Sequence, residues 1–88
     1  MTELRFAWDR AKAAANQAKH GVTFAEAQTV FADEGALLID DPDHSAEEDR
    51  FILLGLSAQL RVLVVVHCYR ESDSLIRLIS ARRANRLE

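Results

Sequence analysis

The chain has 88 residues, the size of one small domain, and 49% of them are hydrophobic, enough for a single core. Its sole cysteine, Cys68, excludes an intramolecular disulfide and a cysteine zinc cluster. The first residues lack the apolar stretch of a signal peptide, and no apolar run approaches the length of a membrane span. We therefore expect one soluble, cytoplasmic domain over residues 1–88, without a metal or cofactor.

The formal charge of -3 conceals a separation of charges along the chain. Residues 33–49 hold eight acids and no lysine or arginine, whereas residues 50–88 hold seven arginines and three acids. Because arginine makes two-pronged contacts with phosphate and carboxylate, the second half would suit a nucleic acid or an acidic partner. A net-negative chain is, however, a poor nonspecific nucleic-acid binder, and a salt-bridged surface is the alternative.

The first third of the chain predicts a short strand and two helices. Residues 4–8 alternate in polarity and are rich in aromatic side chains, which is typical of a strand. Asp9 is suited to cap a helix whose alanines recur on one stripe, and Gly21 suits the left-handed position just past its end. Thr23 and Glu26 then form a T-x-x-E capping box for a second helix.

The junction between these helices carries an ammonium and an imidazole, Lys19 and His20. Cations in a last turn are favoured by the helix dipole, which is sufficient to explain both residues. Their spacing allows a second interpretation, because Lys12, Asn16, Lys19 and His20 stand on one face of the helix. Such a polar stripe suits either solvent or a substrate.

The remaining chain predicts an acidic turn followed by strands. Gly35 ends the second helix, residues 36–39 are an edge strand or an extended stretch, and residues 40–44 form a turn. His44 lies among carboxylates, so a metal site is conceivable there, but an acidic surface loop explains the same residues. Residues 51–56, 60–69 and 75–81 predict strands with short links, and hence antiparallel neighbours.

The middle of these strands is apolar on both faces and is expected at the centre of the sheet. His67 lies near its end, where a histidine is more often buried and hydrogen-bonded than catalytic. Ser80 is suited to cap a terminal helix containing Arg82 and Arg83. Together the elements predict an α+β fold, with a small antiparallel sheet, two N-terminal helices packed on it and a short C-terminal helix.

A larger pattern spans nearly the whole chain. It consists of Trp8-Asp9, Lys12, Asn16, Lys19-His20-Gly21-Val22, Phe24, Ala27, Phe31, Arg50, Gly55, Arg70, Ile76-Arg77, Ile79-Ser80-Ala81-Arg82, Ala84 and Glu88. This combination resembles the BrnT family of toxins. The resemblance implies a RelE-like fold, ribonuclease activity that arrests translation, and neutralisation by a BrnA-type antitoxin with a ribbon-helix-helix DNA-binding part. It also implies repression of the shared operon by a dimeric or heterotetrameric toxin-antitoxin complex.

RNA cleavage without a metal requires a base, an acid and cations that stabilise the phosphorane. We assign proton transfer to His20, with His67 as the second choice, and assistance to Lys19. The phosphate and its developing charge are assigned to Arg70, Arg77 and Arg82, and further RNA contacts to Lys12, Arg61, His67 and Arg83. The alternative function is a non-catalytic binding module that acts as co-repressor with a DNA-binding partner. Trp8 is expected in the core.

Overall fold

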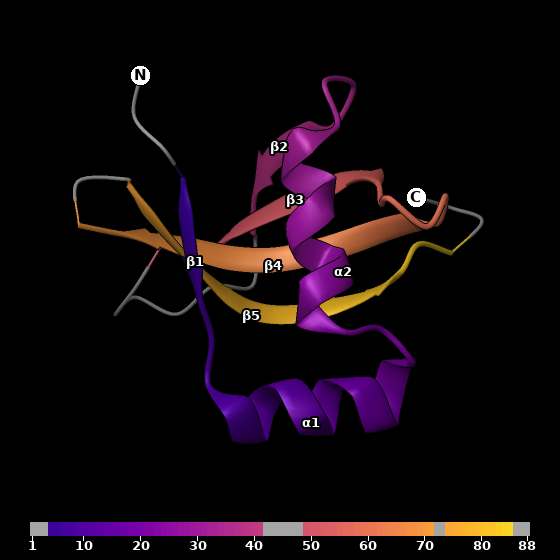
Figure 1. Ribbon diagram of the computed structural model, residues 1–88. Coiled ribbons are helices and arrows are strands. Elements are labelled where there is room, and N and C mark those ends of the chain that lie inside the picture. Colours follow the sequence, from indigo (N-terminus) through magenta and orange to yellow (C-terminus); the bar gives the residue numbers. More distant parts are fainter. Residues whose placement is uncertain (1–3, 42–48, 72–73, 86–88) are drawn as a thin grey trace.

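The computed structural model describes residues 4–41, 49–71 and 74–85. Its elements, in chain order, are β1 (Arg5–Ala7), α1 (Arg10–His20), α2 (Phe24–Thr29), the 3-10 turn η1 (Val30–Ala32), β2 (Leu37–Asp40), β3 (Phe51–Leu56), β4 (Val62–Arg70) and β5 (Leu75–Arg83). Both helices lie on the same side of one five-stranded sheet (Figure 1). The expected α+β class, with two helices and a sheet, is confirmed.

The sheet has the strand order β1-β5-β4-β3-β2 and is mixed. The pairs β2–β3, β3–β4 and β4–β5 are antiparallel, as short links require. Strand β1 pairs with β5 in parallel, with Phe6 opposite Ile76. The prediction of a wholly antiparallel sheet is therefore wrong, because β1 and β5 are separated by most of the chain and no tight turn sets their relative direction.

The expected C-terminal helix is also absent from the described residues. Strand β5 continues through Arg83, which pairs with Leu63, so the backbone groups of residues 80–83 belong to the ladder with β4. Ser80 lies inside this strand and caps no helix. The helices are not both N-terminal either, because strand β1 opens the described chain and α2 begins only at Phe24.

Local capping chemistry explains where each helix begins and ends. The Asp9 carboxylate accepts from the Lys12 backbone N–H at 3.1 Å, and the Thr23 hydroxyl accepts from the Glu26 N–H at 3.0 Å. Gly21 ends α1 with a φ of 70°, a left-handed conformation that glycine adopts without steric cost. The predictions for Asp9 and Gly21 are confirmed. The Thr23 cap is confirmed too, but the Glu26 half of the capping box is not, because its carboxylate accepts from Ser57 and Arg61 instead.

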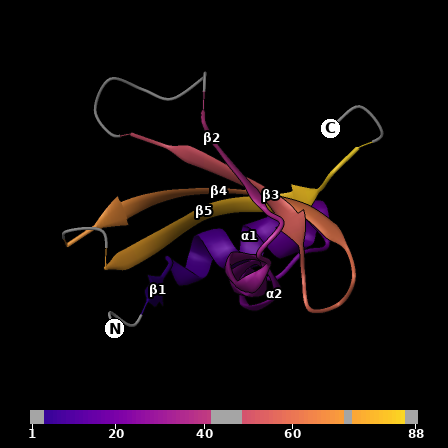
Figure 2. The same ribbon diagram turned by 90° about the horizontal axis from the view of Figure 1, so that it is seen from above.

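The core lies between the helices and one face of the sheet. Phe24, Ala27 and Val30 pack from the helical layer, and Leu63 and Val65 pack from the central strand. Their partners on the other strands include Leu53, Ile76, Leu78 and Ala81. The opposite face of the sheet, called the open face below, carries no helix among the described elements, as the view from above shows (Figure 2).

A bulge in β5 sets which arginines lie on the open face. Val66 pairs with Ser80 and His67 pairs with Leu78, so Ile79 is the extra residue. Residues five apart in a regular strand point to opposite faces, but this insertion puts Arg77 and Arg82 on the same one. The register confirms it, because their partners Cys68 and Val64 also share the open face.

None of the helices in the described chain is long and apolar enough to cross a membrane. Within the same residues, no cluster of three or more His, Cys, Asp and Glu side chains is placed to hold a metal ion. The conceivable metal site at His44 lies outside the described residues.

Candidate functional site: two cationic regions joined by strand β5

Asn16 attaches α1 to the sheet. Strand β1 pairs only with Leu75–Arg77, so the outer edge of β5 is not paired with a strand near Ala81. There Asn16 takes the place of a strand: its Oδ1 accepts from Ala81 N–H at 3.0 Å, and its Nδ2 donates to Ala81 O at 2.8 Å. Nδ2 also donates to Val22 O at 3.0 Å. The buried amide therefore fixes the junction of the two helices beside the end of β5.

Arg61 holds the same junction from the turn between β3 and β4. Its guanidinium forms an ion pair with Glu26 and donates to Gly21 O at 3.3 Å. The Ser57 hydroxyl donates to the same carboxylate at 2.7 Å. The hydrogen bond from Arg61 lowers the pKa of Glu26 below its usual value, and that from Ser57 acts in the same direction.

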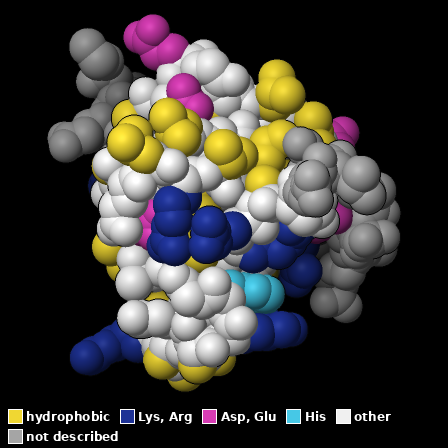
Figure 3. Space-filling model, turned by 90° about the vertical axis from the view of Figure 1, so that its right-hand side faces the viewer, with side chains coloured by type: hydrophobic (Ala, Val, Ile, Leu, Met, Phe, Trp, Pro, Cys, Tyr) yellow, Lys and Arg dark blue, Asp and Glu magenta, His cyan; other side chains and the backbone are white. Residues whose placement is uncertain are grey.

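His20 lies at this junction and is half-buried. In the space-filling view, a single histidine lies between two groups of lysine and arginine side chains (Figure 3). His20 is joined directly to Gly21, whose carbonyl oxygen accepts from Arg61, so the chain places it beside Arg61. Arg83 belongs to the same region, since its charge contributes to lowering the pKa of Glu26. The structure thus brings together His20, Arg61 and Arg83, which we call the junction region.

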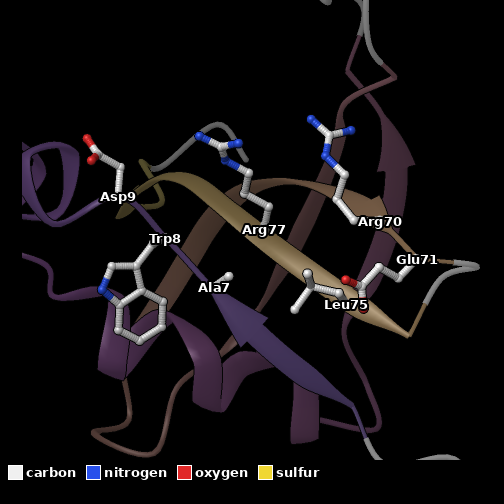
Figure 4. A pocket seen from close by; sticks show the side chains of 7 residues that line it. All are labelled: Ala7, Trp8, Asp9, Arg70, Glu71, Leu75 and Arg77. Carbon is white, nitrogen blue, oxygen red and sulfur yellow. The ribbon is translucent and has the colours of Figure 1, made fainter.

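A second region lies at the other end of α1. A pocket of about 600 Å³ is lined by Ala7, Trp8, Asp9, Arg70, Glu71, Leu75 and Arg77. Arg70 and Arg77 point to the same side, and Asp9 lies at the rim close to Arg77 (Figure 4). The Arg77 side chain is exposed and makes no hydrogen bond or ion pair with any described residue. We call this the arginine pocket.

The two regions are separated by the length of α1. Asp9 in the pocket and His20 at the junction are eleven residues apart, which corresponds to about 16 Å of helix. The predicted site residues therefore form two groups, with Arg77 at the Asp9 end of α1 and His20 at the other end. Arg82 is the neighbour of Arg83 in β5 but lies on the open face, and its guanidinium donates to Arg83 O at 3.3 Å.

His67 occupies the core. Its Nδ1 lies 3.1 Å from Val65 O, its Nε2 lies 3.3 Å from the Tyr69 hydroxyl, and its ring packs edge-on against Phe31. Burial lowers the pKa of His67, so the ring is neutral at pH 7. The assignment of His67 to RNA contact or proton transfer is therefore not retained, because it has no surface for a substrate. The interpretation as a buried, hydrogen-bonded histidine is confirmed.

The remaining predicted residues are surface cations. Lys12 lies in the first turn of α1 and Lys19 in its last, and both are exposed. Lys12 is therefore at the pocket end of the helix and Lys19 at the junction end.

Trp8 packs edge-to-face with Phe24 at 5.9 Å and contributes to the core, as expected.

Sequence reasoning missed two carboxylates of the arginine pocket and the buried pair at the junction. Asp9 was recognised only as a helix cap, although it also lines the pocket. Glu71 was counted only as opposing charge, and it forms an exposed ion pair with Arg5. Glu26 was recognised only as part of a capping box. Nothing in its spacing reveals Arg61, 35 residues away, as its partner.

The fold and these two regions are those of a small α+β protein with two cationic surfaces. The family described as "Ribonuclease toxin, BrnT, of type II toxin-antitoxin system" matches residues 8–88. The chain belongs to this family, which confirms the resemblance seen in the sequence. Membership implies an antitoxin partner.

A solved structure also resembles this chain, that of the ribonuclease toxin BrnT from Brucella abortus. The TM-score is 0.71 at 24% sequence identity, and the likeness covers 94% of this chain and 99% of the Brucella chain. It establishes a shared fold. Among curated proteins no match is found.

Proposed function

We propose that this chain is a ribonuclease that cleaves RNA without a metal ion and arrests translation. The observation that carries the proposal is the half-buried His20 at the end of α1, next to Gly21, whose carbonyl oxygen accepts from Arg61. An imidazole titrates near neutral pH and can take a proton from the 2′-hydroxyl or give one to the departing 5′-oxygen. Membership of a ribonuclease toxin family supports the same reaction.

The cations of the two regions are proposed to contact different phosphates of the RNA. Arg82, Arg83 and Lys19 stabilise the charge that develops on the phosphate near His20. Arg70 and Arg77 hold another phosphate of the same strand in the arginine pocket, and Lys12 adds a contact at that end. Arg61 contributes its charge while it remains paired with Glu26.

The binding partner is proposed to be a BrnA-type antitoxin with a ribbon-helix-helix part that binds DNA, in a dimeric or heterotetrameric complex. The alternative function, a non-catalytic co-repressor, would use the same partner. Cleavage of RNA separates the two, because a co-repressor leaves RNA intact.

The test is incubation of the purified protein with a labelled RNA in EDTA. We expect cleavage by the wild type and a loss of about 10²-fold or more in His20→Gln, the usual size of a general acid–base contribution. Arg82→Ala should lower the rate by a similar factor. Arg10→Ala is the matched control, because Arg10 is an exposed cation of the same helix and lies in neither region.

Two results would overturn the proposal. One is an absence of cleavage by folded wild-type protein that still binds its antitoxin. The other is a pH–rate profile that is identical in wild type and His20→Gln, which would return His20 to the role of a cation in the last turn of a helix.

A further inference from the structure

The open face of the sheet is divided into an apolar half and a basic half. By register, the apolar half is formed by Leu37 and Ile39 of β2, Ile52, Leu54 and Leu56 of β3, and Val62, Val64 and Val66 of β4. Several of these side chains are strongly exposed, with 61% for Leu37, 52% for Ile39 and 49% for Val62. Exposed apolar patches of this kind mark interaction sites.

The basic half adjoins it along β5. Arg77 and Arg82 share this face, and Arg70 of β4 lies near Arg77. None of the described strand residues on the open face is acidic. A ligand that covers the whole face must therefore bring its own negative charges to the β5 side and apolar side chains to the β2 side.

The dimensions suit a helix. Neighbouring strands are about 4.8 Å apart, so β2 and β5, three spacings apart in the sheet, are separated by roughly 14 Å. A helix with its side chains is about 10 Å across. One helix laid over β3 and β4 would contact the apolar half with one flank and the arginines with the other.

We propose that the open face binds an amphipathic, acidic helix of the antitoxin. The apolar side chains of this helix pack on Leu37, Ile39 and Val62, and its carboxylates pair with Arg77. Because the helix then covers Arg77 and Arg82, its binding also blocks access of RNA to β5. The inhibitory part of this inference rests on the proposed ribonuclease function, whereas the docking part does not.

A second copy of this chain fits the face less well. Two copies meeting through their open faces would oppose arginines with arginines or with apolar side chains, since neither copy offers a carboxylate from its strands there. Pairing through the β2 edges would bring together two acidic segments, because residues 33–49 hold eight acids and no base. Charge complementarity therefore favours an acidic partner.

The chain offers a matched pair of variants for the test. Leu38 and Ile39 are adjacent in β2 and each is 52% exposed, but Ile39 is on the open face and Leu38 is on the other. Affinity for the co-expressed, purified antitoxin of the same operon is measured by calorimetry, with folding checked by circular dichroism. We expect Ile39→Asp to weaken binding about tenfold or more, since burying an unpaired charge costs well over 1 kcal/mol. Leu38→Asp should bind like the wild type.

The charge requirement is tested separately with Arg77→Gln. Its affinity should fall and its dependence on salt should be shallower than that of the wild type. Equal binding by Ile39→Asp and Leu38→Asp would overturn the proposal. So would sedimentation showing that Ile39→Asp only converts a dimer of this chain to a monomer without loss of antitoxin affinity.

Failure of the inference and failure of the proposed function give different results. If Ile39→Asp loses antitoxin binding while the wild type cleaves no RNA, the docking surface is supported and the ribonuclease is not. If Ile39→Asp cleaves RNA as the wild type does and is still fully inhibited by the antitoxin, the enzyme is supported and the docking surface is refuted.

Discussion

Replacement of Asn16, the buried residue of α1, by alanine should strongly destabilise the protein. The amide of Asn16 makes three hydrogen bonds, two with the backbone of Ala81 and one with Val22 O, and the residue is only 7% exposed. At about 1 kcal/mol each, their loss costs about 3 kcal/mol. Alanine returns roughly 0.6 kcal/mol through its better helix propensity. The net loss is therefore roughly 2 kcal/mol of unfolding free energy.

For a domain of this size, 2 kcal/mol corresponds to a fall of about 10 °C in Tm. The assay is thermal and urea unfolding followed by circular dichroism, with Gln17→Ala as the control because Gln17 is the exposed neighbour in the same helix. The control should change the stability by less than about 0.5 kcal/mol.

A second substitution tests the direction of the hydrogen bonds. Asn16→Asp keeps the shape but loses the Nδ2 donor, and it places a carboxylate against the carbonyl oxygens of Val22 and Ala81. It should therefore be less stable than Asn16→Ala at pH 7. Equal stability of Asn16→Ala and Gln17→Ala would refute the view that this amide replaces a strand at the edge of β5.

Three further predictions concern the helix junction and the packing of β3. Glu26→Gln should lose roughly 2 kcal/mol at pH 7, and the difference should shrink on acidification. The reason is that Arg61 lowers the pKa of Glu26 in the folded protein. The stabilisation is therefore fully present above about pH 4.5, the ordinary pKa of a glutamate, and is lost as the pH falls through the pKa of the folded protein. Urea unfolding midpoints measured across this pH range test it. Gly55→Ala should cost about 1–3 kcal/mol, because its Cβ would lie 2.7 Å from Ala36 Cβ and 2.9 Å from Val30 Cγ1. Gly21→Ala, which meets no atom within 4 Å, should cost only about 1 kcal/mol of backbone strain in the same unfolding assay.

The features that could be predicted from the sequence depend on short-range chemistry. Asp9, Gly21 and Thr23 set the helix ends through bonds to backbone groups within four residues, so their neighbours contain the necessary information. The central position of β4 could also be predicted, because a strand that is apolar on both faces is typical of the middle of a sheet.

The errors arose where distant segments decide the structure. Ser80-Ala81-Arg82-Arg83 is compatible with a helix by local preference, yet β4 on one side and Asn16 on the other satisfy its backbone as a strand. The parallel direction of β1 likewise depends on β5, which follows it in the chain by about 70 residues. Local sequence carries no signal for either pairing.

The candidate site was predictable in kind but not in arrangement. Arginines on the late strands and a histidine at the helix junction were identified, but their division into two regions depends on the length and direction of α1. The bulge at Ile79, which places Arg77 and Arg82 on one face, has no signature in the surrounding residues. The sequence therefore indicates the types of functional side chain, and the structure shows which of them lie together.

This division makes a prediction about how His20 and Arg77 act together. His20 ends α1, whereas Arg77 of β5 lines the pocket with Asp9 at the start of that helix, and Asp9 and His20 are about 16 Å apart along it, so His20 and Arg77 would contact different parts of an RNA strand. Substitutions at independent sites add within about 0.5 kcal/mol, whereas groups that act on one phosphate are strongly coupled. We therefore expect the losses in log kcat/KM for His20→Gln and Arg77→Ala to sum in the double variant. A double variant no slower than His20→Gln alone would mean that both residues serve one phosphate, and that α1 or β5 must move when RNA binds.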